Sequence, residues 1–217
     1  MTEEALRSLD RKTLRERALV ALRSAVLSGQ YQPGDHLGEV EIASQLNISR
    51  GTVREALRHL QQEGLVTPGA RGMLRVRSLS HDEVGELFRV RGALEGQAIT
   101  EVIAGAQRAH AASALTAALD ELDAAASPVD ALEADLAFHQ RLCELSGNSV
   151  LLSTWRHLEG PIRVVVMSAA SDNRAVPMSA DHHRPIVAAI EQGDADEAVR
   201  VLRDHMATAA ELLTTRA

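Results

Sequence analysis

Apolar residues recur every three or four positions in three segments near the start of the chain, residues 14–27, 40–46 and 50–63. This spacing predicts three amphipathic helices. The apolar face of the third helix consists of Val53, Ala56, Leu57 and Leu60. Short apolar stretches at 65–67 and 73–76 flank a glycine-rich segment, and this pattern predicts two strands joined as a hairpin.

The third predicted helix also carries a row of basic residues. Arg50, Arg54 and Arg58 are four positions apart, so they share a face that differs from the apolar one. Ser49 stands immediately before the helix, and we expect it to cap the N-terminus. A helix that is buried on one side and cationic on the other is typical of one that enters the major groove of DNA. The alternative is a salt-bridged surface helix, with Glu55 as one partner.

Helical periodicity returns after residue 80, and no strand pattern accompanies it. The predicted helices span residues 80–104, 107–126, 129–145, 149–170, 178–192 and 194–214. Short connections between long helices are typical of antiparallel bundles. We therefore expect a mainly α protein, in which a winged helix-turn-helix of three helices and a two-stranded wing precedes an all-α six-helix antiparallel bundle.

Composition agrees with a helical protein of a reducing compartment. Hydrophobic residues make up 45% of the chain and aromatic residues only 2%, so the core must consist mainly of aliphatic side chains, which favours helices. The single cysteine, Cys143, excludes an internal disulfide and suits the cytosol. The N-terminus lacks a signal-peptide pattern, and the apolar run at 164–167 is too short to cross a bilayer. We expect a cytoplasmic protein without a membrane partner.

Charge is distributed unevenly along the chain. The net charge is −7, but residues 1–77 contain 12 basic and 9 acidic residues, a net of +3, whereas residues 78–217 contain 11 and 21, a net of −10. A basic domain attracts phosphates and an acidic one is repelled by them. We therefore predict a DNA-binding domain over 1–77 and a second domain with different partners over 78–217.

Four side chains in the acidic half are candidate metal ligands. Asp135 and His139 are four residues apart on one face of a predicted helix, and His183 and His205 belong to the last two predicted helices. A carboxylate and three imidazoles can complete an N/O ligand set for Zn²⁺ or another divalent transition metal. Because the chain has nine histidines, such a pair also arises by chance, and spacing alone leaves the metal hypothesis open.

A dense set of residues between positions 13 and 77 carries a family resemblance. They are Gly29, Pro33-Gly34, Leu37, Glu39, Ala43, Leu46, Ser49-Arg50, Val53-Arg54-Glu55-Ala56-Leu57, Leu60, Glu63-Gly64-Leu65-Val66 and Arg71-Gly72. In these residues the chain resembles the GntR family of bacterial transcriptional regulators. The resemblance implies a winged helix-turn-helix that binds double-stranded DNA at a pseudo-palindromic operator.

The resemblance and the positions of the side chains together give the expected DNA contacts. They are Ser49, Arg50, Gly51, Thr52, Arg54, Arg58, Arg71 and Gly72. We expect Arg50, at the N-terminal end of its helix, to reach base edges, and Arg54 to contact phosphate or a second base. Arg58 is explained equally well as a solvated arginine. The family usually has Thr-Pro where this chain has Gly51-Thr52, so its operator preference is expected to differ.

A second set of matching residues lies between positions 80 and 214. They are Arg91-Gly92-Ala93-Leu94-Glu95, Asp135-Leu136-Ala137-Phe138-His139, Gly147-Asn148, His183-Arg184, Ile186, Ala189-Ile190, Gly193-Asp194, Ala198 and His205. This part resembles the ligand-binding domain of the FadR subgroup of the same family. The resemblance implies that the carboxylate and the three imidazoles bind a metal, for which we expect Zn, with Ni or Mn as alternatives. It also makes Arg91 a candidate to hold a ligand carboxylate, the alternative being an internal salt bridge with Glu95.

The leading hypothesis is a transcriptional regulator and not an enzyme. We expect a repressor that acts as a homodimer, with 78–217 as the metal- and ligand-binding effector and dimerisation domain, controlled by a small organic acid. One alternative is an all-helical metal-dependent hydrolase that uses Asp135, His139, His183 and His205. The other keeps the regulator and makes the metal purely structural.

Overall fold

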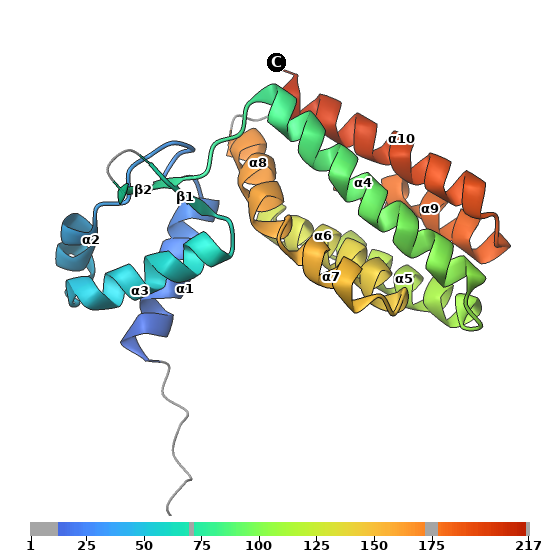
Figure 1. Cartoon of the computed structure of the whole chain (residues 1–217), viewed down its shortest axis with the longest axis horizontal. Helices are drawn as coiled ribbons and strands as arrows, with labels where there is room; N and C mark the ends of the chain where they lie inside the picture. The colour runs from blue at the N-terminus through green and yellow to red at the C-terminus, as the bar shows by residue number, and fades with distance from the viewer. Residues whose placement is uncertain (1–12, 70–71, 172–177, 216–217) are drawn as a thin grey trace, which may run out of the picture. The chain divides into compact units, whose positions relative to one another are not determined.

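The chain divides into two compact units between Arg77 and Ser78, which we call unit 1 (residues 1–77) and unit 2 (residues 78–217). The structure is a computed structural model, and it describes residues 13–69, 72–171 and 178–215 (Figure 1). Each unit has its own core of aliphatic side chains. The two are therefore described separately.

Unit 1 is a three-helix domain with a small antiparallel sheet. Its elements are α1 (Leu14–Leu27), α2 (Glu39–Leu46), α3 (Arg50–Gln62), β1 (Val66–Pro68) and β2 (Leu74–Val76). Helix α3 packs on α1 and α2, and its apolar side chains are almost wholly inaccessible to solvent. The predicted three helices and two-stranded wing are confirmed.

The sheet pairs Val66 with Val76 and Pro68 with Leu74. The loop that follows α1 extends this sheet, because His36 forms an isolated antiparallel bridge with Arg75 on the edge of β2 that β1 leaves open. The wing is therefore held to the helical part of unit 1 by backbone hydrogen bonds as well as by its connection to α3.

Unit 2 is all-helical over the residues that the structure describes. Its helices are α4 (His81–Ala104), α5 (Arg108–Asp123), α6 (Pro128–Leu145), α7 (Ser149–Arg156), α8 (Glu159–Ser171), α9 (Ala180–Gln192) and α10 (Ala195–Thr214). Helices α4 and α10 lie side by side and run in opposite directions, while α5 packs against α6 and α9 (Figure 1).

The single helix expected over residues 149–170 is a wrong prediction. The chain forms two helices there, so the described part of unit 2 has seven helices instead of six. The reason is Pro161, which has no N–H to donate to the carbonyl of His157 and whose ring crowds that carbonyl. Proline is tolerated best in the first turn of a helix, and Pro161 occupies the first turn of α8; within a helix it removes a backbone hydrogen bond, as Pro185 does in α9.

Local sequence signals fix where the helices around the candidate site begin and end. Ser127 caps α6 by accepting a hydrogen bond from the backbone N–H of Asp130, and Asp194 caps α10 in the same way. Helix α9 ends at Gly193, whose φ of 82° is a left-handed conformation that favours glycine. In the part of the chain that is described, we find no helix that combines the length and apolar character needed to cross a membrane.

Candidate metal centre and nucleic-acid interface

Helix α3 begins with a side-chain cap, as its sequence predicts. Ser49 Oγ accepts a hydrogen bond from the backbone N–H of Thr52 at 3.1 Å, and the two hydroxyl oxygens are 2.9 Å apart. The proline that the resemblance leads us to expect at position 52 could not donate this bond, so Thr52 gives α3 an N-terminal hydrogen bond that proline would lack. Gly51 adds no side chain to the exposed tip of the helix.

Two of the three arginines on α3 are engaged in ion pairs. Arg54 donates two hydrogen bonds to Glu39 of α2, at 2.9 and 2.7 Å, and Arg58 donates one to Glu55 at 2.7 Å. The hydrogen bond from Arg54 lowers the pKa of Glu39. Arg50 has no ion-pair partner within the described ranges, which leaves its guanidinium free at the end of α3.

A groove brings together predicted DNA contacts from α3 and from the wing. It encloses about 730 Å³, and its lining includes Arg54, Arg58 and Gly72. Gly72 has a φ of 76°, and a side chain there would meet no neighbouring atom, so a ligand could approach its backbone closely. Arg71, also a predicted contact, lies outside the described residues.

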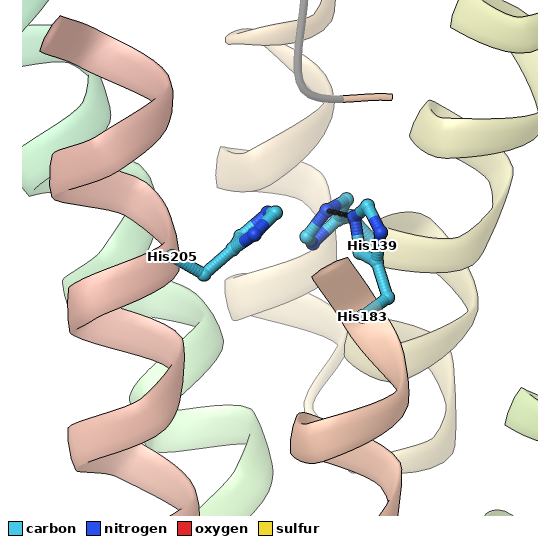
Figure 2. A group of neighbouring side chains, drawn as sticks. All are labelled: His139, His183 and His205. Carbon is cyan, nitrogen blue, oxygen red and sulfur yellow. Dashed lines mark hydrogen bonds between the residues drawn. The ribbon is translucent and has the colours of Figure 1, made fainter. Parts of the chain in front are cut away.

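The four predicted metal ligands lie together inside unit 2. His139 of α6, His183 of α9 and His205 of α10 offer ring nitrogens that are all within 4.8 Å of one another (Figure 2). Asp135 Oδ1 is 3.1 Å from Nε2 of His183, and its Oδ2 is 3.9 Å from Nε2 of His139. His139 and His183 are fully buried.

Hydrogen bonds on the far side of two rings determine what they present to the cluster. Nδ1 of His139 is 2.6 Å from Oε2 of Glu95, and Nδ1 of His183 is 2.8 Å from the carbonyl oxygen of Ser179. The carbonyl oxygen can only accept, and so can the carboxylate of Glu95 when it is ionised. In each neutral ring the proton therefore lies on Nδ1. The two Nε2 lone pairs then face each other at 3.0 Å beside the carboxylate of Asp135. Such a group of acceptors favours a cation.

The environment keeps these groups in the protonation states that a metal needs. Burial lowers the pKa of His139, and the charge of Arg91 lowers it further. Burial and the neighbouring histidines lower the pKa of His205 to about 2. Burial would raise the pKa of Asp135, but its close contact with His183 and the positive charge of Arg91 outweigh burial and lower that pKa. Neutral imidazoles and an ionised carboxylate are the forms that bind Zn²⁺.

Arg91 of α4 forms the internal salt bridge that was the alternative to ligand binding. Its Nε donates to Oε1 of Glu95 at 2.8 Å, and both side chains are almost wholly buried. Its Nη2 is 3.6 Å from Oδ2 of Asp135 and is a buried nitrogen without a hydrogen-bond partner. Arg91 therefore lies beside the histidine cluster with part of its guanidinium still available.

Sequence reasoning missed the importance of Glu95, which it considered only as a partner of Arg91. The carboxylate is fully buried, and it also accepts a hydrogen bond from Nε1 of Trp155 at 2.8 Å. Burial alone would raise the pKa of Glu95, but its contact with His139, the charge of Arg91 and the hydrogen bond from Trp155 lower it to about 2. No local pattern signals these contacts, because His139 and Trp155 are 44 and 60 residues away.

Comparison with known families divides the chain in the same order as its two units. Residues 14–76 match the family described as "Bacterial regulatory proteins, gntR family". Residues 86–208 match the family described as "FCD domain".

Two curated relatives illustrate the proteins to which the chain is similar. It is 32% identical over 186 residues to the "Probable D-xylose utilization operon transcriptional repressor" of Paenarthrobacter nicotinovorans, which covers 84% of this chain and 80% of the relative. It is 27% identical over 154 residues to the "Gluconate operon transcriptional repressor" of Bacillus licheniformis, which covers 70% of this chain and 63% of the relative.

Solved structures share the fold of this chain over most of its length. A transcriptional regulator GntR from Rhodococcus sp. RHA1 is 24% identical with a TM-score of 0.74, and the match covers 94% of this chain and 99% of that one. E. coli McbR/YncC is 18% identical with a TM-score of 0.68, over 93% and 97% of the two chains. At these identities the similarity establishes the fold.

Proposed function

This chain belongs to the GntR family of bacterial regulatory proteins and carries an FCD domain, and we propose that it represses transcription from a pseudo-palindromic operator as a homodimer. We also propose that a small organic acid, bound beside a metal in unit 2, controls its binding to DNA. The family and the relatives indicate a DNA-binding transcriptional regulator and not an enzyme. Repression, dimerisation, the metal and the effector are our proposal.

The DNA-binding part of the proposal is supported by the different states of the arginines on α3. Arg50 projects from the first turn without an ion-pair partner in the described residues, and we assign it to base edges, where a bidentate contact with guanine contributes about 1–3 kcal/mol of discrimination. Arg54 is held by Glu39, so its approach to DNA exchanges one anionic partner for another. Arg54 is therefore assigned to phosphate or to a second base, with a smaller net gain.

The metal part of the proposal is supported by the cluster of acceptors. Asp135, His139, His183 and His205 would hold the ion, and Zn fits three imidazoles and one carboxylate, with Ni and Mn as alternatives. When bound, the ion would supply a Lewis-acidic centre that attracts a carboxylate oxygen. The protein contributes rings whose other nitrogens are already fixed by acceptors, an arrangement that strengthens histidine ligands.

Counting buried charges leads to the class of effector. Arg91 carries +1, while Glu95 and Asp135 carry −1 each, so the site with neutral histidines has a net charge of −1. A divalent ion changes this to +1, which one monoanion would neutralise. Nη2 of Arg91 makes no hydrogen bond and has only the longer ion-pair contact with Asp135, so it is a buried donor for such an anion, and this unsatisfied nitrogen is the observation that carries the proposal. The relative that represses the gluconate operon is named for a small hydroxy acid.

Control of DNA binding then follows from linkage. An acid that weakens operator binding must bind the free protein more tightly than the protein–DNA complex, by the same factor. In a homodimer, a change in unit 2 would alter how two copies of α3 meet two half-sites. Repression is proposed because the two relatives described above are named as repressors.

The first experiment measures operator binding by wild type, Arg50→Ala and Arg141→Ala. Arg141 pairs with Glu144 on the exposed surface of unit 2, so this control removes the same charge from the other unit. We expect Arg50→Ala to lose about 10- to 100-fold in specific affinity and Arg141→Ala to lose nothing. Wild-type binding that shows no sequence preference above its salt-sensitive background would refute the proposal.

The second experiment measures metal content after purification without a nickel column, and then operator release by small carboxylates. We expect close to one divalent ion per chain. We also expect that a small carboxylate releases the wild-type protein from its operator but does not release His139→Ala.

A structural metal is the second candidate, because Asp135 and three histidines could fill a tetrahedral shell without an open position. In that case a chelator would lower the melting temperature and leave small-molecule affinity unchanged.

A further inference from the structure

Glu95 is the centre of a buried network that connects the histidine cluster to α4 and α7. Its Oε2 faces Nδ1 of His139, while its Oε1 accepts hydrogen bonds from both Arg91 and Trp155 at 2.8 Å. The side chain has no solvent-accessible surface. A buried carboxylate with three donors from three different helices has one fixed orientation.

The first consequence concerns the tautomer of His139. An ionised carboxylate can only accept, so the contact of 2.6 Å requires the proton of the neutral ring on Nδ1. Nε2 then has a lone pair, which is directed toward His183 (Figure 2). Oδ2 of Asp135 lies 3.9 Å from the same nitrogen. Without an acceptor on the Nδ1 side, the ring could equally carry its proton on Nε2 and donate to Asp135.

The second consequence concerns Arg91. Its guanidinium lies between two carboxylates, at 2.8 Å from Glu95 but 3.6 Å from Asp135. Glu95 therefore satisfies most of the charge of Arg91. If that carboxylate were neutral, Arg91 would be left with Asp135 as its nearest anion and would compete for the oxygens of a metal ligand.

We propose that Glu95 is a positioning residue of the metal centre, which holds His139 with Nε2 free to bind and, as the closer partner of Arg91, limits the competition of Arg91 for Asp135. This inference rests on the proposed metal site. Removing such an acceptor behind a ligating histidine typically weakens metal binding by 10- to 100-fold. The loss here should lie in the upper part of that range, because one substitution affects two ligands.

The test measures Zn²⁺ affinity by competition with a chromogenic chelator for wild type, Glu95→Gln and Glu101→Gln. Glu101 is the matched control: it lies on the same helix and accepts hydrogen bonds from Gln97 and Asn148, away from the cluster. We expect Glu95→Gln to bind Zn²⁺ about 30- to 100-fold more weakly and Glu101→Gln to bind as wild type does. Equal affinities of wild type and Glu95→Gln would overturn the inference.

A measurement on metal-free protein separates this inference from the metal proposal. Long-range ¹H–¹⁵N correlation spectra of wild type at neutral pH should show His139 protonated on Nδ1, and Glu95→Gln should show a mixture of tautomers. A wild-type His139 protonated on Nε2 would also overturn the inference. If Nδ1 carries the proton but Zn²⁺ does not bind, it is the metal proposal that fails.

A further variant separates charge from position. Glu95→Asp keeps the negative charge on a side chain that is one methylene shorter, so it should still neutralise Arg91 but should not reach both His139 and Trp155. We expect Zn²⁺ affinity between those of wild type and Glu95→Gln. Full recovery of wild-type affinity by aspartate would show that charge alone matters and would contradict the positioning role.

Discussion

Replacement of Arg91 by methionine tests whether the buried network holds unit 2 together. Methionine has a similar length and an apolar side chain, so the substitution removes the charge and the hydrogen bonds while filling most of the volume. Glu95 would then keep His139 and Trp155 as donors but lose its only permanent cation. Asp135 would lose the positive charge at 3.6 Å.

The expected cost follows from the burial of the pair. The side chains of Arg91 and Glu95 are 3% and 0% exposed, so the carboxylate that remains cannot be hydrated. Removing one member of a buried pair typically costs about 3–5 kcal/mol of the free energy of unfolding. Since two neutral donors remain on Glu95, we expect a value near the lower limit, about 3 kcal/mol. This corresponds to a fall in melting temperature of roughly 10 °C for a unit of this size.

The assay is urea unfolding of the full chain in the presence of a chelator, followed by tryptophan fluorescence. Urea does not screen charges, and the chelator removes any stabilisation by bound metal. Trp155 is the only tryptophan and is fully buried in unit 2, so its emission reports the unfolding of that unit alone.

The control is Arg200→Met, because Arg200 pairs with two carboxylates as Arg91 does, and makes more hydrogen bonds to them, but is 60% exposed. It donates two hydrogen bonds to Glu197 and one to Asp204. Exposed pairs are well solvated in the folded and unfolded states, so we expect no measurable loss. A loss of less than about 1 kcal/mol for Arg91→Met, or equal losses for both variants, would refute the argument that burial makes the pair important.

Three further predictions concern protonation, capping and backbone conformation. Burial lowers the pKa of His139, and that of His205 to about 2, below the unfolded value of about 6.5, so the unfolded state takes up more protons in acid. The free energy of unfolding of metal-free unit 2 should therefore fall, below pH 6.5, by up to about 1.4 kcal/mol per pH unit for each histidine. Urea titrations at several pH values measure this fall. Ser49→Ala should cost unit 1 about 1 kcal/mol and weaken operator binding, as measured by thermal melts and binding titrations; unchanged values would contradict the cap. Gly193→Ala should lower the free energy of unfolding by at least about 1 kcal/mol, because Gly193 has a φ of 82°. Gly51→Ala should raise it by up to about 1 kcal/mol, because Gly51 lies inside a helix. Denaturant midpoints that move in the same direction for both variants would contradict this.

The sequence was informative wherever a structural feature depends on short-range periodicity. The buried face of α3, its cap and the turn into the wing follow from residues within one or two helical turns of one another, so they were predictable. The pairing of Arg54 with Glu39 was not, because it joins two helices across 15 positions in the chain. The break between α7 and α8 was predictable in principle from Pro161, but the apolar pattern that continues through it concealed the signal.

The residues of the candidate metal site also differ in how far they could be predicted from short-range spacing. Asp135 and His139 share one helix, and their spacing alone suggested a common direction. His183 and His205 could be assigned only through a family resemblance, since no periodicity links residues on separate helices. Glu95 was considered only for its neighbour at i−4, and its contacts with α6 and α7 depend on how the bundle packs.

The histidine cluster joins helices that a ribosome produces at different times. His139 belongs to α6, but His205 belongs to α10, so the cluster is complete only after the last described helix has emerged and packed. Unit 1, by contrast, contains all of its core within residues 13–77 and can fold while unit 2 is still being synthesised. Under the proposed function, a growing chain therefore folds the unit that contacts one half-site before it completes the site that controls it. Because dimerisation is assigned to unit 2, a chain interrupted before α10 would present a single α3, and the two-half-site contact of the dimer would depend on the same helices that complete the cluster.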